Sequence, residues 1–173
     1  MLGHDPFYNK SIRKTVVLFG TLFNELFLVR YDKSGLNEYE RIQVPLSYGP
    51  KEKFVTRINS DPDLTKSIAI SLPRMSFEMI GINYDITRKQ TTASKNFFTS
   101  NGSMVSQYAP IPYDFDFTLS LYVRNQEDGT QLVEQILPFF TPDYTITADL
   151  IPELNKKFDI PIILNNINPV SYT

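Results

Sequence analysis

The segment 113–140 constrains the fold more than any other part of this sequence, because its hydrophobic period changes once. Over residues 113–123 apolar and polar residues alternate, which predicts a strand with one buried and one solvated face. The apolar residues then recur every three to four positions, which predicts a helix that ends around Pro138. The helical stripe consists of Leu132, Val133, Ile136, Leu137 and Phe140. Burying each large side chain between such elements is worth about 1.5–3 kcal/mol, so this segment predicts a packing unit rather than an active site.

Shorter patterns predict the remaining elements. A helix is expected over residues 8–26, capped by Asn9 or Ser11. Its apolar face would hold Ile12, Val16, Phe19 and Phe23. Residues 25–32 and 39–46 predict a hairpin, and residues 49–60 predict a short helix with an apolar stripe at Phe54, Val55 and Ile58. A long strand, or two strands separated at Pro73, is expected over residues 67–86, with further short strands at 144–154 and 158–167.

The region 87–112 follows neither period and is rich in Ser, Thr, Asn and Pro. We expect a long loop or a β-arm here, with "TSNGSM" as its tight turn. Long excursions of this kind are uncommon inside compact domains and usually carry a function. The 173 residues fit one domain. The predicted fold is α+β, with a mixed or mostly antiparallel sheet flanked by helices.

The residues needed for most catalytic chemistry are scarce. His4 is the only histidine and there is no cysteine, which argues against catalytic triads, zinc sites and disulfides. Asp114 and Asp116 share one strand face and could serve a carboxylate-dependent hydrolase or bind a metal. A solvated strand face produces the same pattern, and we favour that interpretation. We therefore predict no catalytic residue, no cofactor and no metal.

Partners are constrained by charge and hydropathy. The apolar run at residues 15–23 is too short to span a bilayer, so no membrane association is expected. The formal net charge of −2 argues against a phosphate-binding surface over the whole protein. A nucleic-acid binder that stacks bases on its aromatic residues is a further hypothesis, but the strand at 113–123 places aspartates beside its aromatic rings where such a binder needs cations.

Five blocks of the sequence resemble one family. They are "FYNKSIRKTVVLFGTLFNELFLVR", "IQVPLSYGPKEKF", "LPRMSFEMIGINYD", "VSQYAPIPYDFDFTLSLYVRN" and "VEQILPFFTPDYT". In this order they resemble the tail sheath stabiliser and completion protein, or tail terminator, of T-even-like contractile-tailed phages. Members of that family typically continue beyond the position of Thr173, so the chain is expected to lack a C-terminal extension.

The resemblance implies a structural virion protein without enzymatic activity. Such a protein would form a hexameric ring that caps the tail tube and the last sheath ring, ends tail growth and stabilises the sheath. It would present a joining surface to the neck proteins of the head, and DNA would pass through its lumen without specific binding. It would lie at the tail-neck junction of the virion, after assembly in the host cytoplasm. The alternatives are another neck or tail connector protein of a phage, or a carboxylate-dependent hydrolase.

Candidate interface residues come from three features. Lys51 and Lys53 lie in a mixed-charge run that could form a docking surface, although a solvated helix face is the simpler interpretation. Arg74 follows Pro73 in an apolar stretch, where a charge needs a partner within the chain or across an interface. The remaining candidates belong to the expected arm and are Arg88, Lys89, Phe97, Phe98 and Tyr108.

Overall fold

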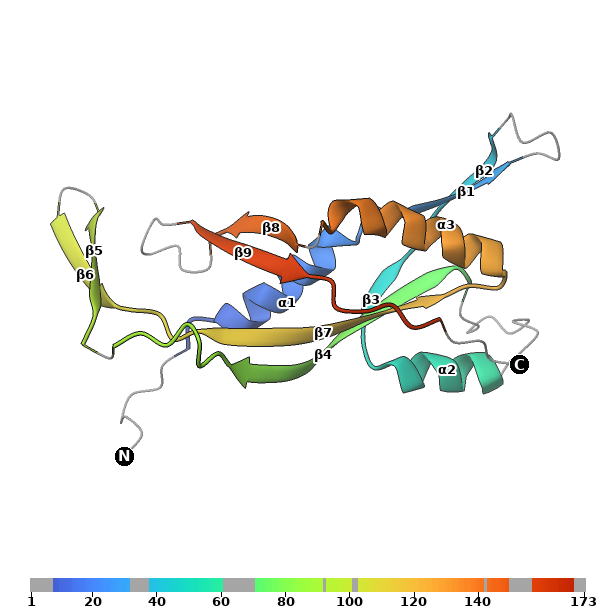
Figure 1. The fold of residues 1–173 in the computed structure, drawn as a ribbon. Helices are drawn as coiled ribbons and strands as arrows, with labels where there is room; N and C mark the ends of the chain where they lie inside the picture. The colour runs from blue at the N-terminus through green and yellow to red at the C-terminus, as the bar shows by residue number, and fades with distance from the viewer. Residues whose placement is uncertain are drawn as a thin grey trace.

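The computed structural model describes residues 8–31, 38–60, 71–91, 93–100, 103–141, 143–149 and 157–169. The helices are α1 (Ser11–Leu22), α2 (Lys51–Ser60), α3 (Gln126–Ile136) and the 3-10 turn η1 (Leu137–Phe139). The strands are β1 (Phe27–Tyr31), β2 (Glu38–Gln43), β3 (Leu46–Tyr48), β4 (Arg74–Tyr84), β5 (Lys95–Ser100), β6 (Ser103–Tyr108), β7 (Tyr113–Tyr122), β8 (Asp143–Ala148) and β9 (Phe158–Ile163). Figure 1 shows their arrangement. The predicted α+β class is confirmed.

The central sheet has the strand order β3-β4-β7. Strand β4 pairs antiparallel with β7 and parallel with β3, so the sheet is mixed. The prediction of one strand over residues 39–46 is therefore wrong at its end: β2 stops at Gln43, and Leu46 begins a separate strand opposite Met75. The β4–β7 register shifts between Met79 and Gly81. This bulge removes Gly81 from the Met79 face and places it beside Asp116.

One face of the sheet carries the main core. Helices α1 and α3 lie over this face (Figure 1). The side chains of Leu28, Val44, Met75 and Leu132 are 0% exposed and form one cluster there. A second cluster consists of Phe19, Phe23 and Phe77, and the ring of Phe19 stacks on Phe117 with centroids 4.4 Å apart. Leu132 therefore packs against the sheet as the helix-on-strand unit predicted.

The opposite face of the sheet is covered at one end. Helix α2 packs there through Phe54, whose ring centroid lies 5.6 Å from that of Tyr122. The hydroxyl groups of Ser76 and Tyr122 share a buried hydrogen bond of 2.9 Å. The prediction that the Tyr122 face is solvated is thus wrong at this end of the strand, because a helix distant in sequence supplies the cover.

Helix α1 differs from its predicted form at its start. Its N-cap is Lys10, in a left-handed conformation with φ of 57°, and neither Asn9 nor Ser11 caps it. Ile12 is exposed although it shares the spacing of the buried Phe19. Gly20 allows close packing, since a Cβ there would lie 2.8 Å from the ring of Phe77 and would force that ring to move.

Two further hairpins flank the core. Strands β1 and β2 pair antiparallel, as do β8 and β9. Helix α3 is tied to β1 by two glutamines: Gln131 bonds the backbone N–H and C=O of Val29, and Gln135 donates to the carbonyl of Phe27. Leu137 belongs to η1 and is exposed, so the predicted apolar stripe of the helix ends at Ile136.

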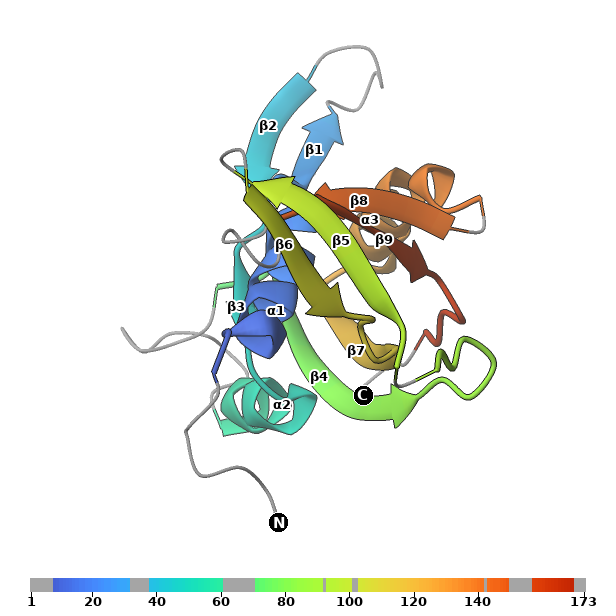
Figure 2. The same ribbon diagram turned by 90° about the vertical axis from the view of Figure 1, so that its left-hand side faces the viewer.

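Strands β5 and β6 form a hairpin in the region where a long loop or a β-arm was expected. They pair antiparallel from Lys95 opposite Tyr108 to Ser100 opposite Ser103. Figure 1 shows them standing away from the body beyond the ends of β4 and β7, and Figure 2 views the molecule from their side. None of the arm residues in the described ranges belongs to the three core clusters.

Candidate protein interface

The β-arm exposes an apolar face. In an antiparallel pair, directly opposite residues point to the same side, so one side carries Lys95, Phe97, Met104 and Tyr108. Phe97, Met104 and Tyr108 are 64%, 78% and 63% exposed. The ammonium of Lys95 lies 4.9 Å from the ring centroid of Tyr108. We call these four residues the arm face. Apolar groups gathered in this way on a projecting element are typical of a binding surface.

A polar network connects the base of the arm to the sheet. Arg88 donates to the carboxylates of both Asp85 and Asp114. Asp85 also accepts bonds from the backbone N–H (2.8 Å) and the hydroxyl (2.6 Å) of Thr87. The Thr87 hydroxyl, and then the Arg88 guanidinium, hold the pKa of Asp85 well below its usual range. The same contact with Asp85 raises the pKa of Arg88.

These contacts give the two strand aspartates structural partners. Asp114 belongs to the network, and Asp116 accepts a 2.6 Å hydrogen bond from the Asn83 amide. This arrangement anchors the base of the arm to β7 through Arg88.

The candidate residues near α2 lie apart from the arm. Arg74 is half-buried; its Nη2 donates to the Ser47 hydroxyl at 3.0 Å, and its guanidinium lies 5.7 Å from the ring centroid of Phe54. Its Nε is buried without a hydrogen-bond partner among the described residues. Lys53 is exposed, and Lys51 is half-buried at the start of α2. Within the described chain, the partner predicted for Arg74 is thus present for its Nη2 but not for its Nε.

The predicted interface residues therefore form two groups. Figure 1 places the arm beyond one end of the central sheet and α2 beneath the other. Arg88 lies at the arm base, Lys89 is exposed beside it, and Phe97 and Tyr108 lie on the arm face. Phe98 occupies β5, but its side chain lies outside the described residues, as do His4 and the tip of the arm.

Sequence reasoning missed two members of the arm face. Lys95 and Met104 were absent from the predicted set, although pairing the strands around a two-residue turn at 101–102 would have placed both beside Phe97. It also missed the exposed Leu137 and Phe139 of η1, because the helical period assigns Leu137 to the buried stripe.

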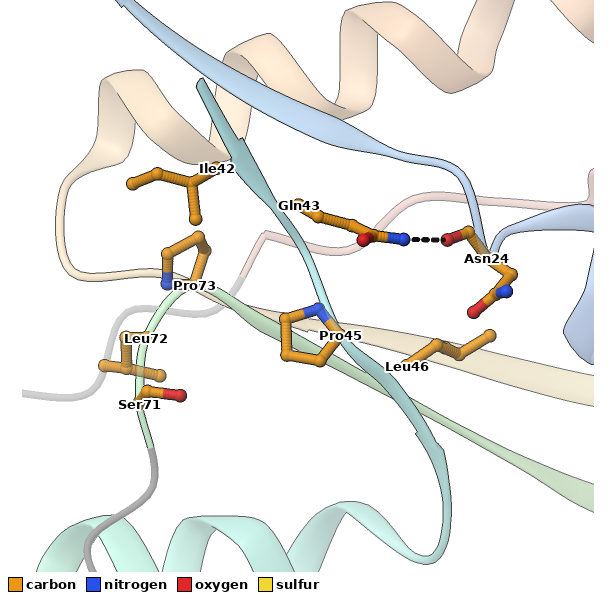
Figure 3. A pocket seen from close by; sticks show the side chains of 8 residues that line it. All are labelled: Asn24, Ile42, Gln43, Pro45, Leu46, Ser71, Leu72 and Pro73. Atoms are coloured by element: carbon orange, nitrogen blue, oxygen red, sulfur yellow. Dashed lines mark hydrogen bonds between the residues drawn. The ribbon is translucent and has the colours of Figure 1, made fainter. Parts of the chain in front are cut away.

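Two hollows in the described part of the body are lined by neutral side chains. One of about 410 Å³ lies between β2, β3 and the start of β4 and is drawn in Figure 3; there, the Gln43 amide donates to the carbonyl of Asn24 at 3.3 Å. Another, of about 240 Å³, lies against α1 and Phe77. The residues named around both are neutral. Neither hollow offers groups for acid-base chemistry.

The described residues hold neither a metal-binding cluster nor a helix able to cross a bilayer. The described part of the chain holds no group of three His, Cys, Asp or Glu side chains placed to bind a metal ion. Of the helices it contains, none has the length and apolarity needed to cross a bilayer.

Comparison with known proteins gives a consistent result. The family described as T4-like virus Myoviridae tail sheath stabiliser matches residues 6–171. The tail completion protein gp15 of Enterobacteria phage T4 is 35% identical over 173 residues. The match covers 95% of this chain and 61% of that protein, so the chain spans about three fifths of its relative. The match over nearly the whole chain shows that this protein belongs to the tail sheath stabiliser family of T4-like phages.

Proposed function

We propose that this protein assembles as a hexameric ring that caps the contractile tail. The ring binds the tail tube and the last sheath ring on one side, and offers the other side to the neck proteins of the head. It acts at the tail-neck junction of the virion, after assembly in the host cytoplasm. Its role is to end tail growth and stabilise the sheath, and it performs no chemical reaction.

The observation that carries this proposal is the β-arm. A two-stranded hairpin is at best marginally stable in water by itself, yet this one exposes Phe97, Met104 and Tyr108 to solvent. A protein gains from such a face when another surface covers it, because burial of each large side chain is worth about 1.5–3 kcal/mol. The arm therefore fits a subunit that completes its stability by assembly.

Growth control follows from the geometry of such contacts. Head-to-tail contacts between identical subunits close into a ring when their rotation closes. A ring that matches the tail end on one face and differs on the other leaves no site for the next sheath ring. Lys51, Lys53 and Arg74 lie at the α2 end, away from the arm, and serve as a second docking surface for a tail or neck protein. The net charge of −2 suits a lumen through which DNA passes without specific binding.

Electron microscopy of tails tests the function. Tails assembled without the protein should be overlong or lose their sheath, and addition of the full-length protein should place a sixfold ring on the end that receives the head. A matched pair of variants tests the arm: Phe97→Ser should weaken ring association by about 30-fold or more, while Ile163→Ser, at a similarly exposed position, should leave it unchanged. Tails of normal length and stability in the absence of the protein would contradict the proposal.

A further inference from the structure

The arm and one corner of the body have opposite charges. Residues 87–112 contain Arg88, Lys89 and Lys95 but no acidic residue. Residues 125–149 contain five acidic residues and no Lys, Arg or His, although the whole chain is nearly neutral. The acidic residues are Glu127, Asp128, Glu134, Asp143 and Asp149. Such a separation of charge within one chain favours contact between two copies over contact between like surfaces.

The acidic segment also exposes apolar side chains. Leu137 and Phe139 are 40% and 62% exposed in η1, where α3 turns towards β8. Glu134 precedes them by one helical turn and Asp143 follows at the start of β8, and both are exposed. Among the described residues neither carboxylate takes part in an ion pair. We call Glu134, Leu137, Phe139 and Asp143 the acidic corner.

Aromatic contacts attach the acidic corner to the body. The ring of Phe139 meets that of Tyr144 edge-on with centroids 6.2 Å apart, and the next residue, Phe140, packs on Phe23 in the core. Figure 1 places the turn between α3 and β8 on the body, well separated from the arm. The arm of one chain therefore does not cover its own corner.

We propose that the arm face of one subunit docks on the acidic corner of the neighbouring copy. Phe97, Met104 and Tyr108 then pack on Leu137 and Phe139, while Lys95 faces Glu134 and Asp143. Because donor and acceptor are different surfaces, the contact is heterologous and repeats around a ring. This inference rests on the proposed ring and assigns the surfaces that hold it together.

The two parts of the contact should contribute unequally. Aromatic side chains buried at the centre of an interface dominate its affinity, whereas charges at the rim mainly set orientation and association rate. Phe97→Ser should therefore weaken ring association by about 30-fold or more, the effect of losing one hot-spot residue. Lys95→Glu should have a smaller effect that fades at high salt, since exposed pairs are screened.

Cysteine cross-linking tests the contact directly, because the chain contains no cysteine. Full-length Phe97→Cys protein mixed with Phe139→Cys protein should form a disulfide-linked heterodimer on mild oxidation. A chain with both substitutions should give a series of cross-linked oligomers that ends at the hexamer. Phe97→Cys mixed with Ile163→Cys, a similarly exposed position on β9, should give none. Arm-to-arm dimers of Phe97→Cys alone would overturn the proposal.

Charge reversal provides a second and independent measurement. Lys95→Glu should weaken the ring in light scattering, and Glu134→Lys together with Asp143→Lys in the same chain should restore it. Lys157→Glu, at an exposed lysine beside β9, is the control and should have no effect. If the protein forms rings but the Phe97→Cys and Phe139→Cys proteins do not cross-link, or the double lysine substitution does not rescue Lys95→Glu, this inference fails while the proposed function stands. If the wild-type protein forms no ring on tails, both fail.

Discussion

The central β4–β7 pair and the β5–β6 arm are both antiparallel, yet the first buries apolar residues that the second leaves exposed. On β4, Met75 and Phe77 are buried beneath helices that come from distant parts of the chain. On the arm, Phe97 and Met104 remain exposed. The same local structure therefore serves stability in one region and leaves a surface open for binding in the other. The difference lies in what covers each strand pair.

The largest expected effect is a difference in unfolding free energy when a methionine of each region is replaced by alanine. Met75→Ala should lower the free energy of unfolding by about 2–5 kcal/mol, because it opens a cavity among fully buried side chains. Met104→Ala should change it by less than about 0.5 kcal/mol, because that side chain is 78% exposed. Urea denaturation followed by circular dichroism measures both. Equal losses would mean that the arm is part of the cooperative core.

A smaller effect is expected at the second layer beneath the sheet. Tyr122→Phe leaves the Ser76 hydroxyl buried without its 2.9 Å partner, so the free energy of unfolding should fall by about 1–3 kcal/mol. Tyr113→Phe, at the exposed end of the same strand, is the control and should be neutral. Adding Ser76→Ala to Tyr122→Phe should recover part of the loss. A neutral Tyr122→Phe would show that the α2 face contributes little to stability.

The smallest effect concerns the anchor of the arm. The lowered pKa of Asp85 means that its network stabilises the fold above the usual carboxyl range and loses this contribution only as the pH falls through the lowered value. Thr87→Val removes the largest cause, so the pKa of Asp85 should rise towards its ordinary value, and the contribution should disappear at a higher pH. Carboxyl titration by NMR measures this. Thr91→Val should leave the pKa unchanged, and a similar rise in both variants would rule out the hydroxyl as the cause.

Much of the fold was predictable because its signals are local. The helix stripe through Leu132 and the β1–β2 hairpin follow from hydrophobic period and turn residues within short windows. Region 87–112 was set apart by its composition, which left a long loop and a β-arm both open. The separate β3 could not be predicted in this way, because its three residues form a strand only by pairing with β4 across an intervening helix. The burial of Tyr122 was missed for the same reason.

The candidate interface was predicted less completely. Phe97 and Tyr108 were selected as apolar residues in a region without a period, and both lie on the arm face. The pairing of Arg88 with Asp114 joins residues 26 positions apart, so only the folded chain brings them together. Arg74 was singled out as a charge in an apolar stretch, and its buried Nε still has no partner among the described residues.

The sequence alone determined the α+β class and the family, and it set region 87–112 apart as a long loop or an arm, because alternation, helical spacing, composition and extended similarity are properties of the order of residues. Only the tertiary structure decided which faces are covered, which arm residues share a side, and where Leu137 and Phe139 emerge at the surface. These outcomes depend on strand register and on helices packing from distant parts of the chain. The physical reason is that burial is set by the neighbours that folding supplies, which no short window of sequence contains.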